Sequence, residues 1–294
     1  MFSGVSERLL GGLVSLALRV LARTDPDRAS NLCGVVARRL GPLLPAHRIG
    51  RANLRAAFPE ATTQWVEKTL RGAWENLGRV AAEYVHLGRL WDYDPDHPNN
   101  GRIVTDDEAL FRELRDDGKP ALCFTAHLGN WELPAVMATA HGLASAVVYR
   151  MPNNCAVAAE VTRIRAPLMG RLIRTRAQAA LEMAAALQRG DHLGMLVDQH
   201  FSRGVEVTFF GHRCMANPSI ARLARQFDCP VVGVRVIRLP EGRFRIAGEG
   251  PLELPRDAAG VVDVAAATQM ITGIVEAWIR EHPEQWLWFH RRWR

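Results

Sequence analysis

Short apolar runs alternate with amphipathic stretches over the last two thirds of the chain. The apolar runs predict strands at 102–105, 120–125, 144–149, 171–174, 192–197, 230–238 and 243–249. The stretches between them predict helices at 106–117, 131–142, 154–168, 177–189, 217–228 and 263–281, and the segment 198–216 has no clear periodicity. Strands that alternate with helices predict an α/β fold, with a mainly parallel central sheet flanked by helices.

The first 90 residues have a helical pattern throughout. A helix over 9–22 would be about 21 Å long, which is short of the roughly 30 Å hydrocarbon core of a bilayer. Its arginines and small residues recur every three or four positions, which favours a helix at the membrane interface over a spanning one. An ordinary amphipathic helix packed on the core is the alternative. We expect membrane-associating helices over 1–45 and one domain over 46–294, with a helical lead-in (46–90) and an α/β core (102–294).

Charge and cysteine usage narrow the choice of partners. The formal net charge is +6, and residues 1–60 carry nine arginines against four acidic residues. An anionic membrane or an acidic protein suits this excess. Nucleic acid is not expected, because no helix-turn-helix, zinc-finger or RNA-binding signature is present. The five cysteines are odd in number and form no C-x-x-C pair, which indicates reduced thiols facing a cytosol.

The most informative motif follows the strand predicted at 120–125. His127 comes just after this strand, Gly129 and Asn130 form a turn, and Glu132 opens the next helix. A carboxylate at that place could accept a hydrogen bond from one imidazole nitrogen, leaving the other to take a proton from an alcohol. Amides at the helix start could stabilise developing negative charge.

Other chemistries fit the sequence less well. A histidine near a strand end is often purely structural. A metal site at His127 and His200 lacks an H-E-x-x-H or similar spacing, so no metal is expected. A serine hydrolase would need a G-x-S-x-G elbow, which is absent. A base without a protein nucleophile indicates direct transfer to a bound hydroxyl.

The segment "TAHLGNWE" (125–132) resembles the H-x4-D/E motif of the lysophospholipid acyltransferase superfamily. The chain most resembles its bacterial late lipid A acyltransferases, the lauroyl and myristoyl transferases. Further stretches that carry this resemblance, in the same order, are "IGRANLRAAFPE" (49–60), "WENLGRVAAEY" (74–84), "VVYRMPNN" (147–154), "LVDQ" (196–199), "VEVTFFG" (205–211) and "PEQWLWFHRRWR" (283–294). The resemblance implies a glycerol-3-phosphate acyltransferase-like fold and an acyltransferase domain over 46–294.

The resemblance also implies roles for individual residues. His127 would be the general base and Glu132 its orienting acid, with Glu206 as the second candidate for that orienting role. Arg150 would hold a phosphate or another anion of the acceptor. Asn130, Asp198 and Gln199 are further candidates for substrate binding, the last two because they follow a parallel strand.

Two roles are possible for each group of aromatic and basic residues toward the C-terminus. Phe209 and Phe210 would wall the acyl pocket or simply pack in the core. Arg291, Arg292 and Arg294 would be a charged tail or a basic face for the membrane or an acidic carrier protein. The tryptophans 286, 288 and 293 suit a membrane interface, with core packing as the alternative.

The activity implied is transfer of a fatty acyl chain from the phosphopantetheine of acyl carrier protein to a hydroxyl of a lipid A precursor. Acyl-CoA is the alternative donor, no bound cofactor is expected, and the reaction would occur at the cytoplasmic face of the inner membrane. A phosphatidylinositol mannoside or an ornithine lipid is the alternative acceptor. A thioesterase-like hydrolase and a non-catalytic membrane scaffold are the alternatives from other functional classes.

Overall fold

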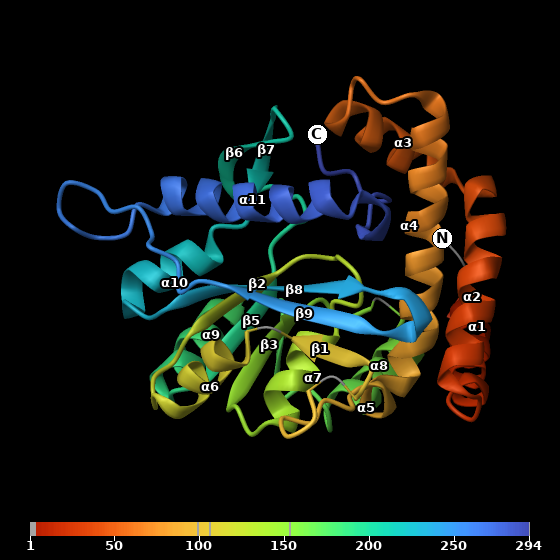
Figure 1. Ribbon diagram of the computed structural model, residues 1–294, viewed down its shortest axis with the longest axis horizontal. Helices are drawn as coiled ribbons and strands as arrows, with labels where there is room; N and C mark the ends of the chain where they lie inside the picture. The colour runs from red at the N-terminus through yellow and green to blue at the C-terminus, as the bar shows by residue number, and fades with distance from the viewer. Residues whose placement is uncertain (1–3, 99, 106, 153, 294) are drawn as a thin grey trace.

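A seven-stranded sheet lies at the centre of the computed structural model, which describes residues 4–98, 100–105, 107–152 and 154–293 (Figure 1). Its strands are β1 (Ile103–Thr105), β2 (Leu122–Thr125), β3 (Ser145–Tyr149), β4 (Arg171–Arg174), β5 (His192–Leu196), β8 (Val231–Arg238) and β9 (Phe244–Glu249). They are ordered β1-β9-β8-β2-β5-β3-β4, and every neighbouring pair is parallel except β8–β9. The predicted α/β fold with a mainly parallel sheet is confirmed.

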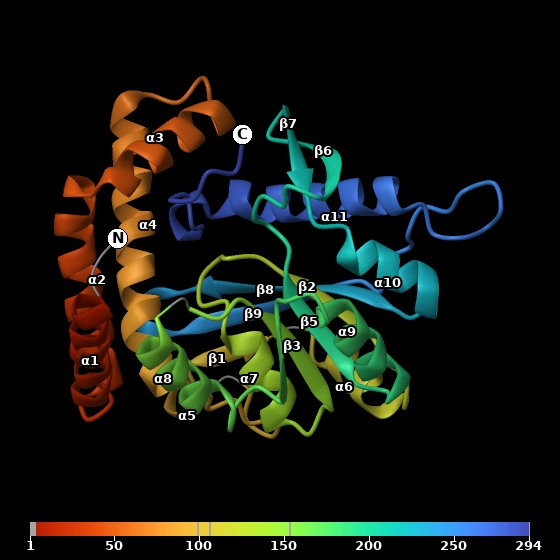
Figure 2. The same cartoon turned by 180° about the vertical axis from the view of Figure 1, so that it is seen from behind.

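Helices cover both faces of the sheet, which explains why its strands are apolar on both sides. One face packs against α9 (Ala179–Gln188), α10 (Ser219–Phe227) and α11 (Val264–Glu281). The other face packs against α5 (Leu87–Leu90), α7 (Leu133–Ala140) and α8 (Cys155–Arg165). Helix α6 (Glu108–Asp116) packs against Ala121, Cys123 and Val232, at the central β2–β8 pair. Figures 1 and 2 show α11 and α7 on opposite sides of the sheet.

The N-terminal helices stand at the end of the sheet where the parallel strands finish (Figure 1). They are α1 (Gly4–Leu21), α2 (Pro26–Leu40), α3 (Pro45–Ala57) and α4 (Thr63–Glu83), joined by the short turns η1 (Gly41–Leu43) and η2 (Tyr84–His86). The Thr62 hydroxyl caps α4 by accepting from the Trp65 amide at 3.2 Å. Helix α2 packs along α4, and α1 lies against α8, where Arg19 pairs with the buried Glu160 at 2.7 Å.

The outer side of α1 and α2 carries exposed apolar side chains. Those of Leu16, Val20, Leu32, Val35, Val36 and Leu40 are exposed, as are those of Leu43 and Leu44 in the following turn. Within the described part of the chain, no helix combines the length and the apolar character needed to cross a membrane.

A two-stranded hairpin occupies the segment that the sequence left unassigned. Strands β6 (Val205–Phe209) and β7 (His212–Ala216) pair in antiparallel fashion around a loop of Phe210 and Gly211. Both loop residues have positive φ, 51° and 76°, as a tight turn of this kind requires. Asn-Gly or Asp-Gly usually signals such a turn in a sequence. Because Phe210 precedes Gly211 here, the sequence did not predict the turn.

The remaining short elements are η3 (Pro240–Gly242), between β8 and β9, and η4 (Pro283–Gln285), after α11. Residues beyond η4 return across the end of the sheet toward α4, so the C-terminal segment lies close to the carboxyl ends of β2 and β5 (Figure 1).

Candidate active site

His127 and Asp198 face each other at the carboxyl ends of two neighbouring strands. In the parallel β2–β5 pair, Thr125 is in register with Leu196. Two further residues along each strand bring His127 opposite Asp198. The carboxyl edge of a parallel sheet is where open α/β folds place their ligands.

The hydrogen bonds of His127 fix its ring. Its Nδ1 lies 2.8 Å from Asp198 Oδ1, and its backbone amide donates to Asp198 Oδ2 at 2.9 Å. The Gln199 amide nitrogen lies 3.4 Å from Nε2 of the ring. Because a carboxylate accepts and an amide N–H donates, these partners assign the proton to Nδ1 and leave a lone pair on Nε2. The side chain of His127 is 15% exposed, so it is not fully enclosed by the protein.

Asp198 is held as a buried carboxylate. Burial alone would raise the pKa of this carboxyl, but the His127 ring and the hydrogen bonds from His127 outweigh it and hold the pKa well below its usual range. The Trp286 indole N–H also donates to Oδ2, at 2.7 Å. A charged Asp198 stabilises the imidazolium that forms when Nε2 takes a proton.

Glu132 occupies a different place from the one predicted. It precedes α7 and is 7% exposed, and its carboxylate pairs with the Arg165 guanidinium at 2.6 and 3.2 Å. Arg165 lies over the rings of Tyr84 and Tyr149, 5.5 Å from each centroid. The prediction that Glu132 orients the ring of His127 is therefore corrected: in this structure Asp198 does so, from the neighbouring strand.

The structure also corrects the orienting role predicted for Glu206 and the substrate contact predicted for Asn130. Glu206 lies on β6, its side chain is 52% exposed, and it pairs with Arg213 across the hairpin. It therefore gives no support to His127. Asn130 is fully buried; its amide donates to Glu83 Oε2 at 2.8 Å, and its oxygen accepts from the Glu132 amide at 3.3 Å. A side chain satisfied in this way shapes the turn and does not face a substrate.

The first amides of α7 are already occupied, because those of Glu132 and Leu133 donate to the side chain and the carbonyl of Asn130. The predicted use of helix-start amides for a developing oxyanion is therefore not supported for these two groups.

The other candidate substrate ligands lie at the same edge of the sheet. Arg150 directly follows β3, and its side chain is exposed. Its proposed contact with an acceptor anion stays a prediction. Gln199 is exposed beside the His127 ring, at a suitable place to contact a substrate. Asp198, in contrast, is enclosed and holds the histidine.

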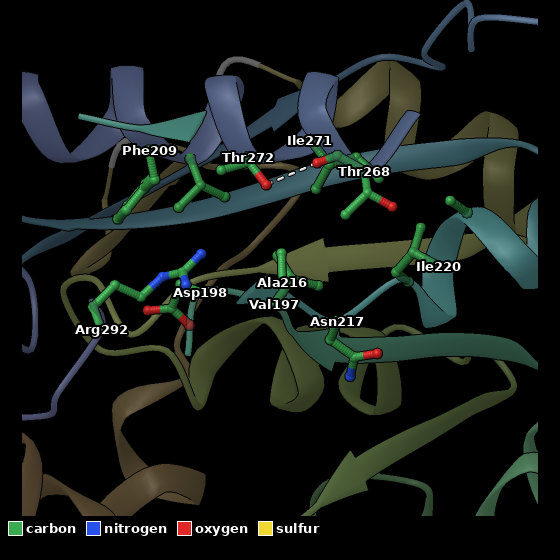
Figure 3. Close-up of a pocket in the computed structure, with 12 residues that line it drawn as sticks. Val197, Asp198, Phe209, Ala216, Asn217, Ile220, Thr268, Ile271, Thr272 and Arg292 are labelled. Carbon is green, nitrogen blue, oxygen red and sulfur yellow. Dashed lines mark hydrogen bonds between the residues drawn. The ribbon is translucent and has the colours of Figure 1, made fainter. Parts of the chain in front are cut away.

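Phe209 and Phe210 belong to an aromatic cluster behind the site. Both rings are buried, and Phe209 stacks on Trp293 while Phe210 contacts Phe58 edge to face. Figure 3 shows Phe209 beside a small cavity that Asp198 and Arg292 also line. Core packing of the two rings is evident, and a role as acyl-pocket wall stays a prediction.

The C-terminal segment is part of the core. Trp286, Trp288 and Arg292 are almost fully buried, so the prediction that these tryptophans face a membrane interface is wrong for the first two. The Arg292 guanidinium donates to the Met215 carbonyl at 2.9 Å, while Arg291 is exposed. Arg294 lies outside the described residues.

Sequence reasoning missed the orienting role of Asp198, the Glu132–Arg165 pair and the contact from Trp286. Each depends on which elements become neighbours in space. One signal was available in the sequence, since both His127 and Asp198 come just after a predicted strand.

The comparisons with known proteins address the whole chain. Among curated proteins, none matches it significantly. The family described as bacterial lipid A biosynthesis acyltransferase matches residues 7–294. The match includes both members of the His127–Asp198 pair and the C-terminal segment that contacts them. The chain therefore belongs to the bacterial lipid A biosynthesis acyltransferase family.

Proposed function

We propose that this lipid A acyltransferase moves a fatty acyl chain from the phosphopantetheine of acyl carrier protein to a hydroxyl of its lipid A precursor, with His127 as the general base. The observation that carries the proposal is the His127–Asp198 pair, in which Nδ1 is held at 2.8 Å and Nε2 keeps its lone pair beside the exposed Gln199. This is the arrangement a base needs in order to deprotonate an alcohol.

The reaction proceeds by direct transfer. Nε2 of His127 takes the proton of the acceptor hydroxyl as its oxygen attacks the thioester carbonyl. The C–S bond then breaks, and the imidazolium returns the proton to the departing thiolate. Asp198 keeps the ring in one tautomer and stabilises its positive charge during the transfer. No covalent acyl-enzyme forms.

Acyl carrier protein is the proposed donor because the reactive edge offers cations to an acidic partner. Arg150, Arg203 and Arg291 are exposed, and none of them takes part in an ion pair between described residues. Arg150 is the one that follows a central strand, so it is proposed to bind an anionic group of the acceptor. Acyl-CoA is the alternative donor.

The cytoplasmic face of the inner membrane is the proposed location. The apolar outer side of α1 and α2, with the turn at 41–44, is bordered by the exposed arginines 28, 39 and 48. Leucines flanked by arginines suit insertion into the boundary between acyl chains and anionic headgroups.

His127→Ala tests the mechanism. Loss of the base should lower transfer from acyl carrier protein to a lipid A precursor by about 10²–10⁴-fold. His97→Ala, at an exposed histidine paired with Asp94, is the control and should keep wild-type activity. Near-normal transfer by His127→Ala would reject the mechanism.

The acceptor is tested by leaving it out. A transferase releases little free fatty acid from the thioester when no lipid is present, whereas a hydrolase releases it at the full rate. Transfer to a phosphatidylinositol mannoside or an ornithine lipid, with none to the lipid A precursor, would assign the enzyme a different acceptor.

A further inference from the structure

The segment 285–290 crosses directly behind the catalytic histidine. The Leu287 amide donates to the His127 carbonyl at 3.1 Å, and the Gly129 amide donates to the Gln285 carbonyl at 3.2 Å. Leu128 and Trp286 form an isolated antiparallel bridge between these bonds. The loop that carries His127 is therefore paired with the C-terminal segment as a short ribbon.

Trp286 extends this pairing to the catalytic acid. Its ring is 1% exposed, and its Nε1–H donates to Asp198 Oδ2 at 2.7 Å. The same oxygen accepts the His127 backbone amide, while Oδ1 accepts Nδ1 of the ring. These donors fix the carboxylate plane from both ends, so Oδ1 stays aligned with the imidazole.

We infer that Trp286 is a positioning residue for the acyl transfer, holding Asp198 in the rotamer that orients His127. The inference rests on the proposed function and adds to it a residue that never touches the substrate. Its physical basis is that a buried carboxylate needs hydrogen-bond donors. When one donor is lost, the carboxylate either rotates toward another donor or interacts more strongly with the donors that remain.

The other groups facing Asp198 do not replace the indole. His290 is packed against Trp286, and its Nδ1 lies 2.8 Å from the Leu287 carbonyl, so that nitrogen is engaged in its own segment. Burial lowers the pKa of His290, which favours the neutral form of its ring. Arg292 points toward Asp198 in Figure 3, but its guanidinium donates to the Met215 carbonyl and lies over the Phe209 ring, and among the described residues no hydrogen bond or ion pair joins it to Asp198.

Trp288 provides a matched control two residues away. It is also fully buried, and it contacts Trp286 edge to face. Its Nε1–H donates to the Pro283 carbonyl at 2.7 Å and makes no bond to Asp198. Trp288→Phe therefore removes an indole N–H from the same segment without changing the carboxylate.

The test compares Trp286→Phe with Trp288→Phe by steady-state kinetics over a range of pH. Trp286→Phe should lower kcat by about 10–100-fold, the factor that corresponds to one charge-assisted hydrogen bond, with KM unchanged. The acid limb of its kcat profile should move to higher pH, because a less satisfied Asp198 attracts the ring proton more strongly. Trp288→Phe should leave the limb in place. If the acid limb of the kcat profile lay at the same pH in Trp286→Phe, Trp288→Phe and the wild type, the inference would be overturned.

A second substitution guards against loss of folding. Replacing Trp286 by 3-benzothienylalanine keeps the ring shape and exchanges N–H for sulfur. It should reproduce the loss of kcat and the displaced limb. Wild-type kinetics with this residue would show that only the shape of the ring matters, which would also overturn the inference.

A readout without substrate separates this inference from the proposed function. Histidine-selective NMR, assigned with His127→Gln, follows the titration of the His127 ring in the full chain. Trp286→Phe should move that titration to higher pH, and Trp288→Phe should not. If the wild type transferred no acyl group, the proposed function would fail, and the NMR comparison would still accept or reject the contact's effect on His127.

Discussion

Asp198 carries a negative charge in a buried site, and such a charge is costly unless hydrogen-bond donors surround it. Its donors are the ring and the amide of His127 and the indole of Trp286. Two of these belong to the residue that Asp198 orients. The charge therefore exists in the resting enzyme and is available when the imidazole takes a proton, with little reorganisation during the reaction.

Asp198→Asn should lower acyl transfer by about 10²–10⁴-fold, because a neutral amide neither selects the Nδ1–H tautomer nor stabilises the imidazolium. Glu206→Gln is the comparison, since the exposed Glu206 pairs only with Arg213 among the described residues. It should keep activity within about twofold of wild type, as surface changes usually do. Initial rates with acyl carrier thioester measure both. A large loss of activity in Glu206→Gln together with a small loss in Asp198→Asn would instead assign the orienting role to Glu206.

At this scale the sequence identified His127 as the candidate base but not the acid that contacts its ring. The strand, turn and helix around His127 are local features, so the base was recognisable from residues 120–140. The orienting acid depends on which strand lies beside β2, and that strand, β5, begins 70 residues after β2 begins. Glu132 was the nearest acid in sequence, but its carboxylate pairs with the half-buried Arg165 on α8.

Among the elements, α4 links the sheet to the loop of the active site. The Asn76 amide donates to the carbonyls of Gly129 and Gln285 at 3.0 and 2.9 Å, and its oxygen accepts from Arg238 at 2.9 Å. Arg238, at the end of β8, also pairs with Glu83 near the end of α4 at 2.6 Å. One helix thus fixes the His127 turn and the C-terminal segment together.

Asn76→Ala should destabilise the protein by roughly 3 kcal/mol or more, since it leaves two buried carbonyls and part of a guanidinium without their partner. Urea unfolding followed by tryptophan fluorescence would measure this. Asn31→Ala removes an exposed partner of Arg79 and should change the free energy of unfolding by less than about 0.5 kcal/mol. Equal effects of the two substitutions would contradict the importance of the α4 link.

Element boundaries were predictable wherever periodicity and capping agreed. The strand expected at 171–174 matches β4, and the helix expected at 263–281 matches α11 to within one residue. The β6–β7 hairpin was missed because its turn contains Phe210 at positive φ. Aromatic packing against Phe58 and Trp288 compensates for that backbone cost, and these contacts come from distant segments.

For the whole molecule, stability should decrease as the pH falls from about 7.5 to 5.5. Burial lowers the pKa of His86, His141, His192 and His290. Between the folded and unfolded pKa values, the unfolded chain binds more protons, so acidification favours unfolding. The stabilisation is complete above the unfolded histidine value, about 6.5, and is lost below it. Carboxylates with lowered pKa values lose their contribution only in more acidic solution.

Urea midpoints measured across this pH range provide the test. His192→Gln should flatten the dependence, because it removes one buried titrating ring. His97→Gln, at an exposed position, should leave the dependence as steep as in the wild type. A wild-type midpoint that does not change over the range would contradict a contribution from the buried histidines.

We expect the whole molecule to bind a lipid surface through the outer side of its N-terminal helices. Leu43 is 78% exposed and Leu32 is 65% exposed on the outer side of the N-terminal helices. Since burying a leucine side chain is worth about 1.5–3 kcal/mol, Leu32→Asp combined with Leu43→Asp should lower binding to anionic vesicles by at least about tenfold. Leu181→Asp, at a 74% exposed leucine on α9, is the matched control and should bind as the wild type does. Vesicle sedimentation measures all three proteins, and equal losses would show that binding depends on general charge and not on this apolar face.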